Sequence, residues 1–161
     1  ASRGVGETPT TVPIGLLVPA MGYLVASGGL DGAFWAMVPA LLLYGMVFIL
    51  IVQLPDMEGD ARAGKPSIIA RRGRTFGYRA AAVAATLASL HFVVLGLVAP
   101  GAAPVDLDVA FLASLVPLGL TAGGALRGDT TFEGAGKSAT ATMGSLFAFN
   151  ILFNAYMLAG L

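Results

Sequence analysis

The stretch AFWAMVPALLLYGMVFILIVQL occupies residues 33–54 and contains no Lys, Arg, Asp or Glu. A helix of about 20 apolar residues crosses a hydrocarbon core about 30 Å thick. Strands of a membrane barrel would be about 10 residues long and would alternate, so helices are the expected spanning form. Four further stretches share these properties and cover residues 11–27, 80–99, 109–126 and 139–161. The sequence therefore predicts an all-α membrane protein with five transmembrane helices, in a single region that covers residues 1–161.

The composition of the chain supports a membrane environment. Of its 161 residues, 57% are hydrophobic and 11% are charged, whereas a soluble domain carries about 25% charged residues. A chain of this length cannot bury so much apolar surface in water. The formal net charge is zero, so no nucleic-acid partner is expected. Cysteine is absent, which excludes disulfides, thiolate metal sites and cysteine nucleophiles.

The basic residues fall in alternate polar gaps between the five stretches. Arg3 precedes the first stretch, six Lys and Arg residues lie in the 55–79 segment, and Arg127 and Lys137 lie in the last gap. The intervening gaps contain none. By the positive-inside rule, the basic gaps face the cytoplasm. We therefore expect a multi-pass protein of the cell membrane, with its N-terminus and its charged 55–79 segment on the cytoplasmic side.

The 55–79 segment also contains a pair of carboxylates with helical spacing. Asp56 and Asp60 are four residues apart, so on a continuing helix both side chains lie on one face, about 5–6 Å apart at Cβ. Two like charges at the mouth of a membrane cavity repel each other, and a divalent cation would convert this repulsion into binding. Oxygen ligands, and few of them, favour Mg²⁺ that is shared with a substrate phosphate. Arg62 and Lys65 follow closely and could bind phosphate oxygens. Alternatively, the segment is a solvated helix end whose basic residues only set the topology.

The sequence around this pair resembles a known motif. Residues 56–65 read DMEGDARAGK and residues 69–73 read IARRG. Together they are similar to the second aspartate-rich motif of the UbiA superfamily of intramembrane prenyltransferases, D-x-x-x-D-x-x-x-G-K followed by a short segment that ends in Gly. The resemblance is closest to the 1,4-dihydroxy-2-naphthoate, or menaquinone-type, branch, and GVGE at residues 4–7 resembles a G-x-G-E stretch of that branch. The five apolar stretches match the last five of the family's nine helices.

Two features depart from the family pattern. Gln53-Leu54-Pro55 stands where the menaquinone-type branch commonly has Asn and Arg. The family's first aspartate-rich motif, N-x-x-x-D-x-x-x-D, does not occur in this sequence. The resemblance therefore implies that the chain is the C-terminal half of such an enzyme. Four N-terminal helices with the other half of the metal site would then belong to the same gene product or to a separate chain.

The resemblance implies an enzyme that transfers a polyprenyl group from a polyprenyl diphosphate to an aromatic acceptor, as in quinone and menaquinone biosynthesis. The implied cofactor is Mg²⁺. Asp56 and Asp60 would hold the metal and would act in catalysis together with Lys65. Arg62 and Lys65 would bind the diphosphate.

Further substrate contacts are expected from three positions. The G-x-G-E resemblance implies that Glu7 binds the aromatic acceptor; alternatively, Glu7 is an acid near a helix N-terminus, where the dipole favours a negative charge. Gln53 is a polar residue near the inner end of its span. Tyr44 shares a helix face with Phe48, where aromatic rings could stabilise an allylic cation; ordinary packing is the alternative for this pair. Residues 67–72 would form a short amphipathic lid or, equally, a helix that lies on the membrane surface.

The sequence alone leaves other functions open. The acceptor could be a non-aromatic lipid. A non-enzymatic multispanning or transport protein could bind a coupling cation at Asp56 and Asp60, although such a protein would be expected to place acids inside its spans. His91 lies mid-span and is expected to be neutral and hydrogen-bonded. Asn150 and Asn154 are expected to form hydrogen bonds between helices.

Overall fold

The computed structural model describes residues 7–65, 67–103, 106–128 and 130–159, without the side chains of residues 7–9 and 153–159. Every element in these ranges is a helix. In chain order the elements are α1 (Glu7–Val12), the π-helical turn η1 (Pro13–Leu17), α2 (Val18–Ser27), α3 (Gly32–Arg62), α4 (Ile68–Val98), α5 (Leu107–Arg127) and α6 (Phe132–Ala159). The predicted all-α fold is therefore confirmed.

Four helical segments are long and apolar enough to cross a membrane: Thr10–Ser27, Gly32–Arg62, Ile68–Val98 and Leu107–Arg127. They correspond to the first four predicted stretches. The fifth stretch, residues 139–161, coincides with most of α6, but its last residues lie outside the part of the chain that the structure describes. A fifth span therefore stays a prediction.

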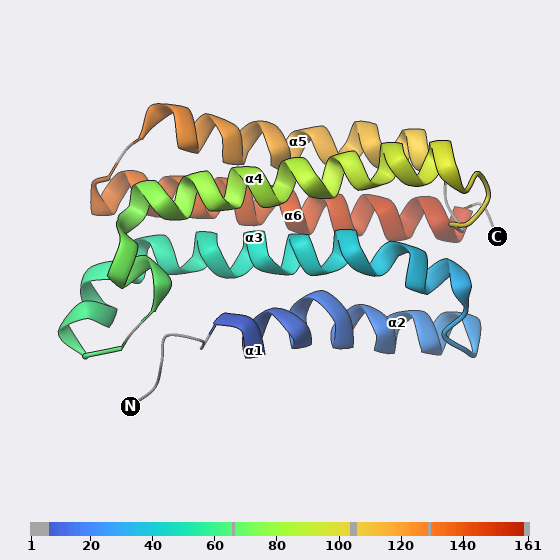
Figure 1. The fold of residues 1–161 in the computed structure, drawn as a ribbon, viewed down its shortest axis with the longest axis horizontal. Coiled ribbons are helices and arrows are strands. Elements are labelled where there is room, and N and C mark those ends of the chain that lie inside the picture. Colours follow the sequence, from blue (N-terminus) through green and yellow to red (C-terminus); the bar gives the residue numbers. More distant parts are fainter. Residues whose placement is uncertain (1–6, 66, 104–105, 129, 160–161) are drawn as a thin grey trace.

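The long helices lie side by side along the length of the molecule (Figure 1). α3 contacts α4, α6 and the α1–η1 segment, α4 also contacts α5, and α5 contacts α6. The α3–α4 and α5–α6 connections lie at the same end as the start of α1, and the other two connections lie at the opposite end. All Lys and Arg residues in the described ranges lie in or near the two connections of the first end, called here the basic end. Its assignment to the cytoplasm stays a prediction.

α1 and η1 approach α3 closely through two glycines. A Cβ atom on Gly45 would lie 2.9 Å from both Cα and the amide nitrogen of Gly15, and a Cβ on Gly15 would lie 2.8 Å from the carbonyl oxygen of Leu41. Only residues without a side chain allow backbones to come so near. Pro13 opens η1, and because proline has no amide hydrogen it cannot donate the regular helical bond.

At the opposite end, Asp31 caps the N-terminus of α3 and links it to α2. Its carboxylate accepts hydrogen bonds from the Phe34 amide at 3.0 Å and from the Tyr23 hydroxyl at 2.9 Å. These two contacts, the amide first, lower the pKa of Asp31. An N-terminal cap of this kind satisfies a backbone donor that the helix itself leaves unpaired.

α4 is bent near its start, at the basic end. Gly73 has φ 81° and ψ 166°, a conformation outside the helical region that side-chain-bearing residues rarely adopt. Residues 68–72 therefore form a short separate helical segment. In this segment Ile69 is fully buried and lies against Leu54 and Gly77, whereas Arg71 and Arg72 are exposed. The segment is thus amphipathic, as expected from the sequence.

The hydrophobic core lies between α3, α4 and α6. Val47, Ile51 and Leu54 of α3 are fully buried, as are several alanines of α4, whose small side chains let the helices pack closely. In contrast, the candidate span Thr10–Ser27 is only 6% buried. Most of the apolar surface of this span is therefore available for contact with lipid or with further helices.

Candidate functional site

Three of the predicted site residues share one face of α3 at the basic end. Gln53, Asp56 and Asp60 follow the i, i+3, i+7 spacing of a single helical face. Asp56 lies eleven residues after Gly45, which is about three turns, so this face is the one that approaches η1. Asp56 is exposed, whereas the Asp60 side chain retains 14% of its accessible surface. Both carboxylates therefore project from one face of α3, as the sequence spacing predicts.

The amide oxygen of Gln53 is the unusual polar atom of this face. It is buried and has no hydrogen-bond partner among the described residues. A buried polar atom without a partner costs free energy, so such an atom often marks the place of a ligand or an ordered water. Gln53 thus adds a third oxygen to the face that carries Asp56 and Asp60.

Lys65 reaches Asp60 because the chain turns back after α3. Gly64 adopts a left-handed conformation with φ 65°, which glycine reaches at no steric cost. The Lys65 amide then donates to the Asp60 carbonyl at 2.9 Å, and its ammonium nitrogen lies 3.3 Å from the Asp60 carboxylate. The Lys65 side chain remains 71% exposed, so the ammonium has donors left for a phosphate oxygen.

α1 runs antiparallel to α3 and begins near the same place. The Thr11 carbonyl lies beside Gly45, and Glu7 is one turn before Thr11. The backbone of Glu7 is therefore level with the turn of α3 that ends at Gln53. The Glu7 side chain lies outside the described part of the structure.

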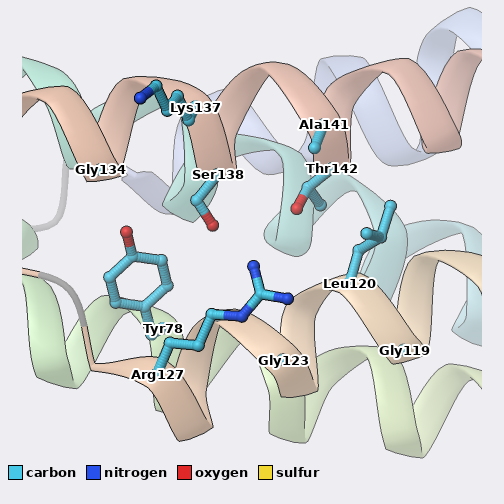
Figure 2. Close-up of a pocket in the computed structure, with 11 residues that line it drawn as sticks. Tyr78, Gly119, Leu120, Gly123, Arg127, Gly134, Lys137, Ser138, Ala141 and Thr142 are labelled. Carbon is cyan, nitrogen blue, oxygen red and sulfur yellow. The ribbon is translucent and has the colours of Figure 1, made fainter.

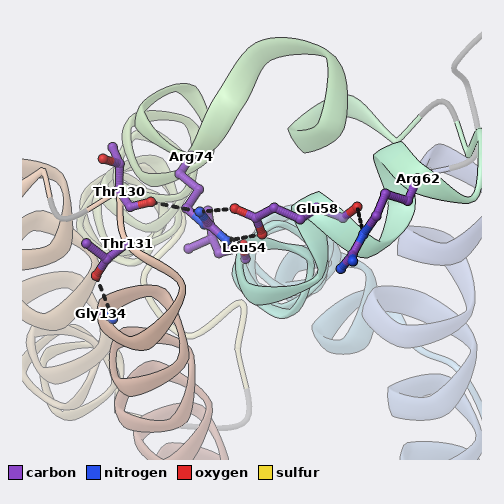
Figure 3. Close-up of polar contacts among 7 residues, drawn as sticks. All are labelled: Leu54, Glu58, Arg62, Arg74, Thr130, Thr131 and Gly134. Atoms are coloured by element: carbon purple, nitrogen blue, oxygen red, sulfur yellow. Dashed lines mark hydrogen bonds and ion pairs between the residues drawn. The ribbon is translucent and has the colours of Figure 1, made fainter.

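Arg62 does not join the predicted site. Its Nε donates to the Glu58 carbonyl of the preceding turn at 3.2 Å, and its guanidinium lies on the side of α3 away from Arg74 (Figure 3). Within the described residues it makes no contact with Asp60 or Lys65. Arg62 is exposed, so its long side chain can adopt other positions when an anion is present.

Tyr44 lies in the core, away from the carboxylates. It is 9% exposed and its ring lies 5.4 Å from Phe149 and 6.5 Å from Phe92. Asp56 is twelve residues later, about 18 Å along the helix. Phe48 contacts Phe147 edge-on at 6.4 Å. These aromatic residues pack α3 against α4 and α6, and the structure does not bring them to the carboxylate pair.

Sequence reasoning missed an ion pair on the opposite face of the same turn. Arg74 is 3% exposed and its guanidinium bonds both carboxylate oxygens of Glu58, at 2.6 and 2.5 Å. It also donates to the carbonyls of Leu54 at 2.8 Å and Thr130 at 2.7 Å (Figure 3). Arg74 therefore fastens the carboxylate-bearing end of α3 to α4 and to the α5–α6 connection. The only clue in the sequence was a Glu between the two Asp residues.

The donor set on α3 fits part of a magnesium site. Among the described residues no group of three Asp, Glu, His or Cys side chains could hold a metal ion. Asp56 and Asp60 supply carboxylate oxygens, and Gln53 supplies a buried oxygen that has no hydrogen-bond partner within the described ranges. Mg²⁺ binds through one or two carboxylates, with substrate phosphates and waters as its other ligands. These residues therefore fit a metal that is shared with a phosphate.

Two other polar residues of the predicted spans have structural contacts. His91 Nε2 lies 2.8 Å from the carbonyl oxygen of Ala36, so the ring donates from Nε2 and links α4 to α3. The Asn150 amide donates to the Leu146 carbonyl of its own helix at 2.9 Å. The side chain of Asn154 lies outside the described part of the structure.

A cavity of about 340 Å³ lies elsewhere at the basic end, between α5 and α6. None of the residues predicted to form the site lines it. Arg127 and Lys137, noted in the sequence only for their charge, are among its lining residues (Figure 2). Because its shape depends on how two helices pack, the sequence pattern gave no indication of it.

Comparison with families of known proteins finds a match over most of the chain. The sequence model described as the UbiA prenyltransferase family matches residues 8–151, a range that contains the whole of α3 and the turn to Lys65. No curated protein and no solved structure matches the chain significantly.

Proposed function

The chain belongs to the UbiA prenyltransferase family, and on that premise we propose that it transfers a polyprenyl group from a polyprenyl diphosphate to an aromatic acceptor of the quinone-precursor type. The protein is an integral membrane protein, which suits a donor with a lipid-soluble tail. One observation carries the proposal. Asp56, Asp60 and the buried oxygen of Gln53, which has no hydrogen-bond partner in the part of the chain that the structure describes, share one face of α3 at the basic end.

The main electrostatic requirement of this reaction is stabilisation of the negative charge on the departing diphosphate. The bond between the allylic carbon and the diphosphate oxygen breaks, and both electrons leave with the oxygen. Mg²⁺ held by Asp56 and Asp60 would supply the positive charge that stabilises this leaving group. Lys65 already lies at Asp60, so a small movement would bring its ammonium to a phosphate oxygen. Arg62 is the second cation in reach of this turn, and its fork can bind two oxygens at once.

The acceptor would approach from the side of α1. A carbon of the electron-rich ring bonds the allylic cation, and the ring then loses a proton. We assign Glu7 to acceptor binding, because α1 begins level with Gln53. Water must be excluded, since it would capture the cation. Residues 68–72 are suited to act as a cover, because Ile69 anchors them in the core while Arg71 and Arg72 remain at the surface.

The active site would be completed by further helices. The α3 face with Asp56 is exposed, and the span Thr10–Ser27 buries little of its apolar surface. We propose that helices carrying a second aspartate-rich segment, from the same gene product or from a separate chain, pack on this side. They would supply the ligands of a second Mg²⁺ and close the cavity around the prenyl tail.

A non-aromatic lipid is the alternative acceptor. The turn Gln53-Leu54-Pro55 departs from the Asn and Arg that the menaquinone-type branch commonly has, and this turn borders the proposed acceptor position. The donor half of the reaction would be unchanged, because it depends on the carboxylates and cations alone. The proposed role in menaquinone biosynthesis therefore depends on which acceptor the enzyme uses.

The proposal is tested with labelled polyprenyl diphosphate and the full-length protein in lipid bilayers. Asp56→Asn and Asp60→Asn each remove the negative charge of a proposed metal ligand at constant shape, and we expect transfer to fall by about 10² or more. Asp108→Asn is the matched control, because Asp108 is an exposed acid at the opposite end. Unchanged transfer in the first two variants would refute the site. Comparison of 1,4-dihydroxy-2-naphthoate with a hydroxylated lipid as acceptor decides the second half of the reaction.

A further inference from the structure

The cavity between α5 and α6 is built differently from the carboxylate site. Its walls consist largely of small residues, among them Gly119 and Gly123 of α5 and Gly134 and Ala141 of α6. The absence of larger side chains leaves about 340 Å³ open at the basic end of the bundle. A space of this size holds a polar head group of several non-hydrogen atoms.

Thr142 leaves an unpaired hydroxyl at this cavity. Its side chain is 1% exposed, it lines the cavity, and its Oγ1 has no hydrogen-bond partner among the described residues. A helical Thr usually bonds the carbonyl four residues earlier, as Thr140 does with Gly136 at 3.0 Å. Ser138 is one turn before Thr142, and Figure 2 shows both hydroxyls directed toward the space between the helices. A ligand that accepts hydrogen bonds would satisfy the Thr142 hydroxyl and could also accept from Ser138.

Arg127 makes the cavity cationic. Figure 2 shows its guanidinium between α5 and α6, directed toward Ser138 and Thr142. No carboxylate of the described residues pairs with it. Lys137 also lines the cavity, but its ammonium lies 2.7 Å from the Glu133 carboxylate, which partly neutralises its charge. The lining residues therefore include a guanidinium and hydroxyl groups that can donate hydrogen bonds, and they include no acidic side chain. This combination suits the oxygens of a phosphate group.

An apolar surface continues from the cavity along α5. Leu120 lines the cavity and is 38% exposed. Val116 and Leu112 lie one and two turns away on the same face, and they are 60% and 61% exposed. A lipid with its phosphate in the cavity could lay its acyl chains on this stripe. A free phosphate ion would gain nothing from it.

From these contacts we propose that the cavity between α5 and α6 binds the phosphate group of a membrane phospholipid, with the acyl chains along Leu112, Val116 and Leu120. This site shares no residue with the proposed prenyl-transfer site, so either one can fail without the other.

The test measures lipid-dependent thermal stability of the full-length protein in detergent. The probes are phosphatidylglycerol, diacylglycerol with the same chains, and inorganic phosphate. We expect phosphatidylglycerol alone to raise the melting temperature. In Arg127→Ala and Thr142→Val the half-saturating concentration should rise by about tenfold or more, because a charge-assisted or buried hydrogen bond is lost. Native mass spectrometry should show less retained phospholipid in the same variants.

Matched controls separate this site from general attraction to lipid heads. Arg79→Ala removes an exposed arginine at the same end, and Thr140→Val removes a hydroxyl that bonds its own helix. Both should respond to phosphatidylglycerol as the unmodified protein does. Without lipid, Thr142→Val should be at least as stable as the unmodified protein, since an unpartnered hydroxyl is removed. Equal responses in all four variants would overturn the proposal, and a full shift with diacylglycerol or inorganic phosphate would overturn the phospholipid as its ligand.

Discussion

Replacement of Arg74 with Met should destabilise the protein by about 3 kcal/mol. The buried guanidinium donates to the carbonyl oxygens of Leu54 and Thr130 at 2.8 and 2.7 Å. A hydrogen bond from a charged donor contributes about 1.5–3 kcal/mol net. The lower value applies here, because the Leu54 oxygen also closes a helical bond and Thr130 is exposed. The bonds to Glu58 should add little, since that side chain is 46% exposed and water can replace them.

The assay is reversible unfolding in mixed detergent micelles, followed by circular dichroism. The control is Arg72→Met, because Arg72 is an exposed neighbour whose guanidinium lies 4.9 Å from the Phe76 ring. An exposed contact of that kind contributes about 0.5–1 kcal/mol. Arg74→Lys should recover only part of the loss, since one ammonium cannot copy the planar fork. Equal destabilisation by Arg74→Met and Arg72→Met would refute the reasoning.

Three further predictions concern the backbone and the metal. Gly45→Ala should lower the free energy of unfolding, followed by circular dichroism, by about 1–3 kcal/mol, because the new methyl group would lie 2.9 Å from Gly15. Gly22→Ala is the control. Its new methyl group would have nothing within 4 Å, so it should leave the free energy of unfolding unchanged or raise it. Gly73→Ala should cost about 1–3 kcal/mol because φ is 81° and ψ is 166°, while Gly64→Asn in a left-handed turn should be tolerated in the same assay. Removal of divalent cations with EDTA should abolish prenyl transfer from labelled diphosphate, and added Mg²⁺ should restore it; transfer that persists in EDTA would contradict the proposed metal.

The sequence predicted the helices well because membrane spans are defined by long apolar runs. It located the ends of the spans less well. The predicted stretch ends at residue 54, but α3 continues through Pro55 to Arg62. Hydropathy reports where the chain leaves the hydrocarbon, and hydrogen bonding decides where the helix ends. α3 ends only where Gly64 turns the backbone into the left-handed region.

The contacts between helices could not be read from one sequence. Glu58 and Arg74 are 16 residues apart, and they meet because Gly73 bends α4 back toward α3. Tyr44 was a plausible substrate contact by spacing, but its partners Phe92 and Phe149 come from two other helices. The Asp56–Asp60 pair was accessible to prediction, because its geometry is local to one helical turn.

Asp56 differs from the other described acidic residues in its hydrogen-bond and ion-pair partners. Seven acids have described side chains, and most of them bind a specific donor: Asp31 and Asp106 cap helices, Glu58 binds Arg74, Asp60 binds Lys65 and Glu133 binds Lys137. Asp108 has no such partner in the described part of the chain, but it lies in the first turn of α5, where the helix dipole favours a negative charge.

Asp56 has neither a partner nor such a position among the described residues. It lies about two turns before the end of α3, beyond the last turn in which the helix dipole acts, and one turn from the like charge of Asp60. Its removal should therefore leave stability unchanged or slightly improved, whereas Asp60→Asn loses an exposed ion pair that contributes about 0–1 kcal/mol. Asp56→Asn is for that reason the cleaner test of function. If it unfolds at the same temperature as the unmodified protein, a loss of prenyl transfer reflects the chemistry of the carboxylate, and retained transfer excludes Asp56 from the site.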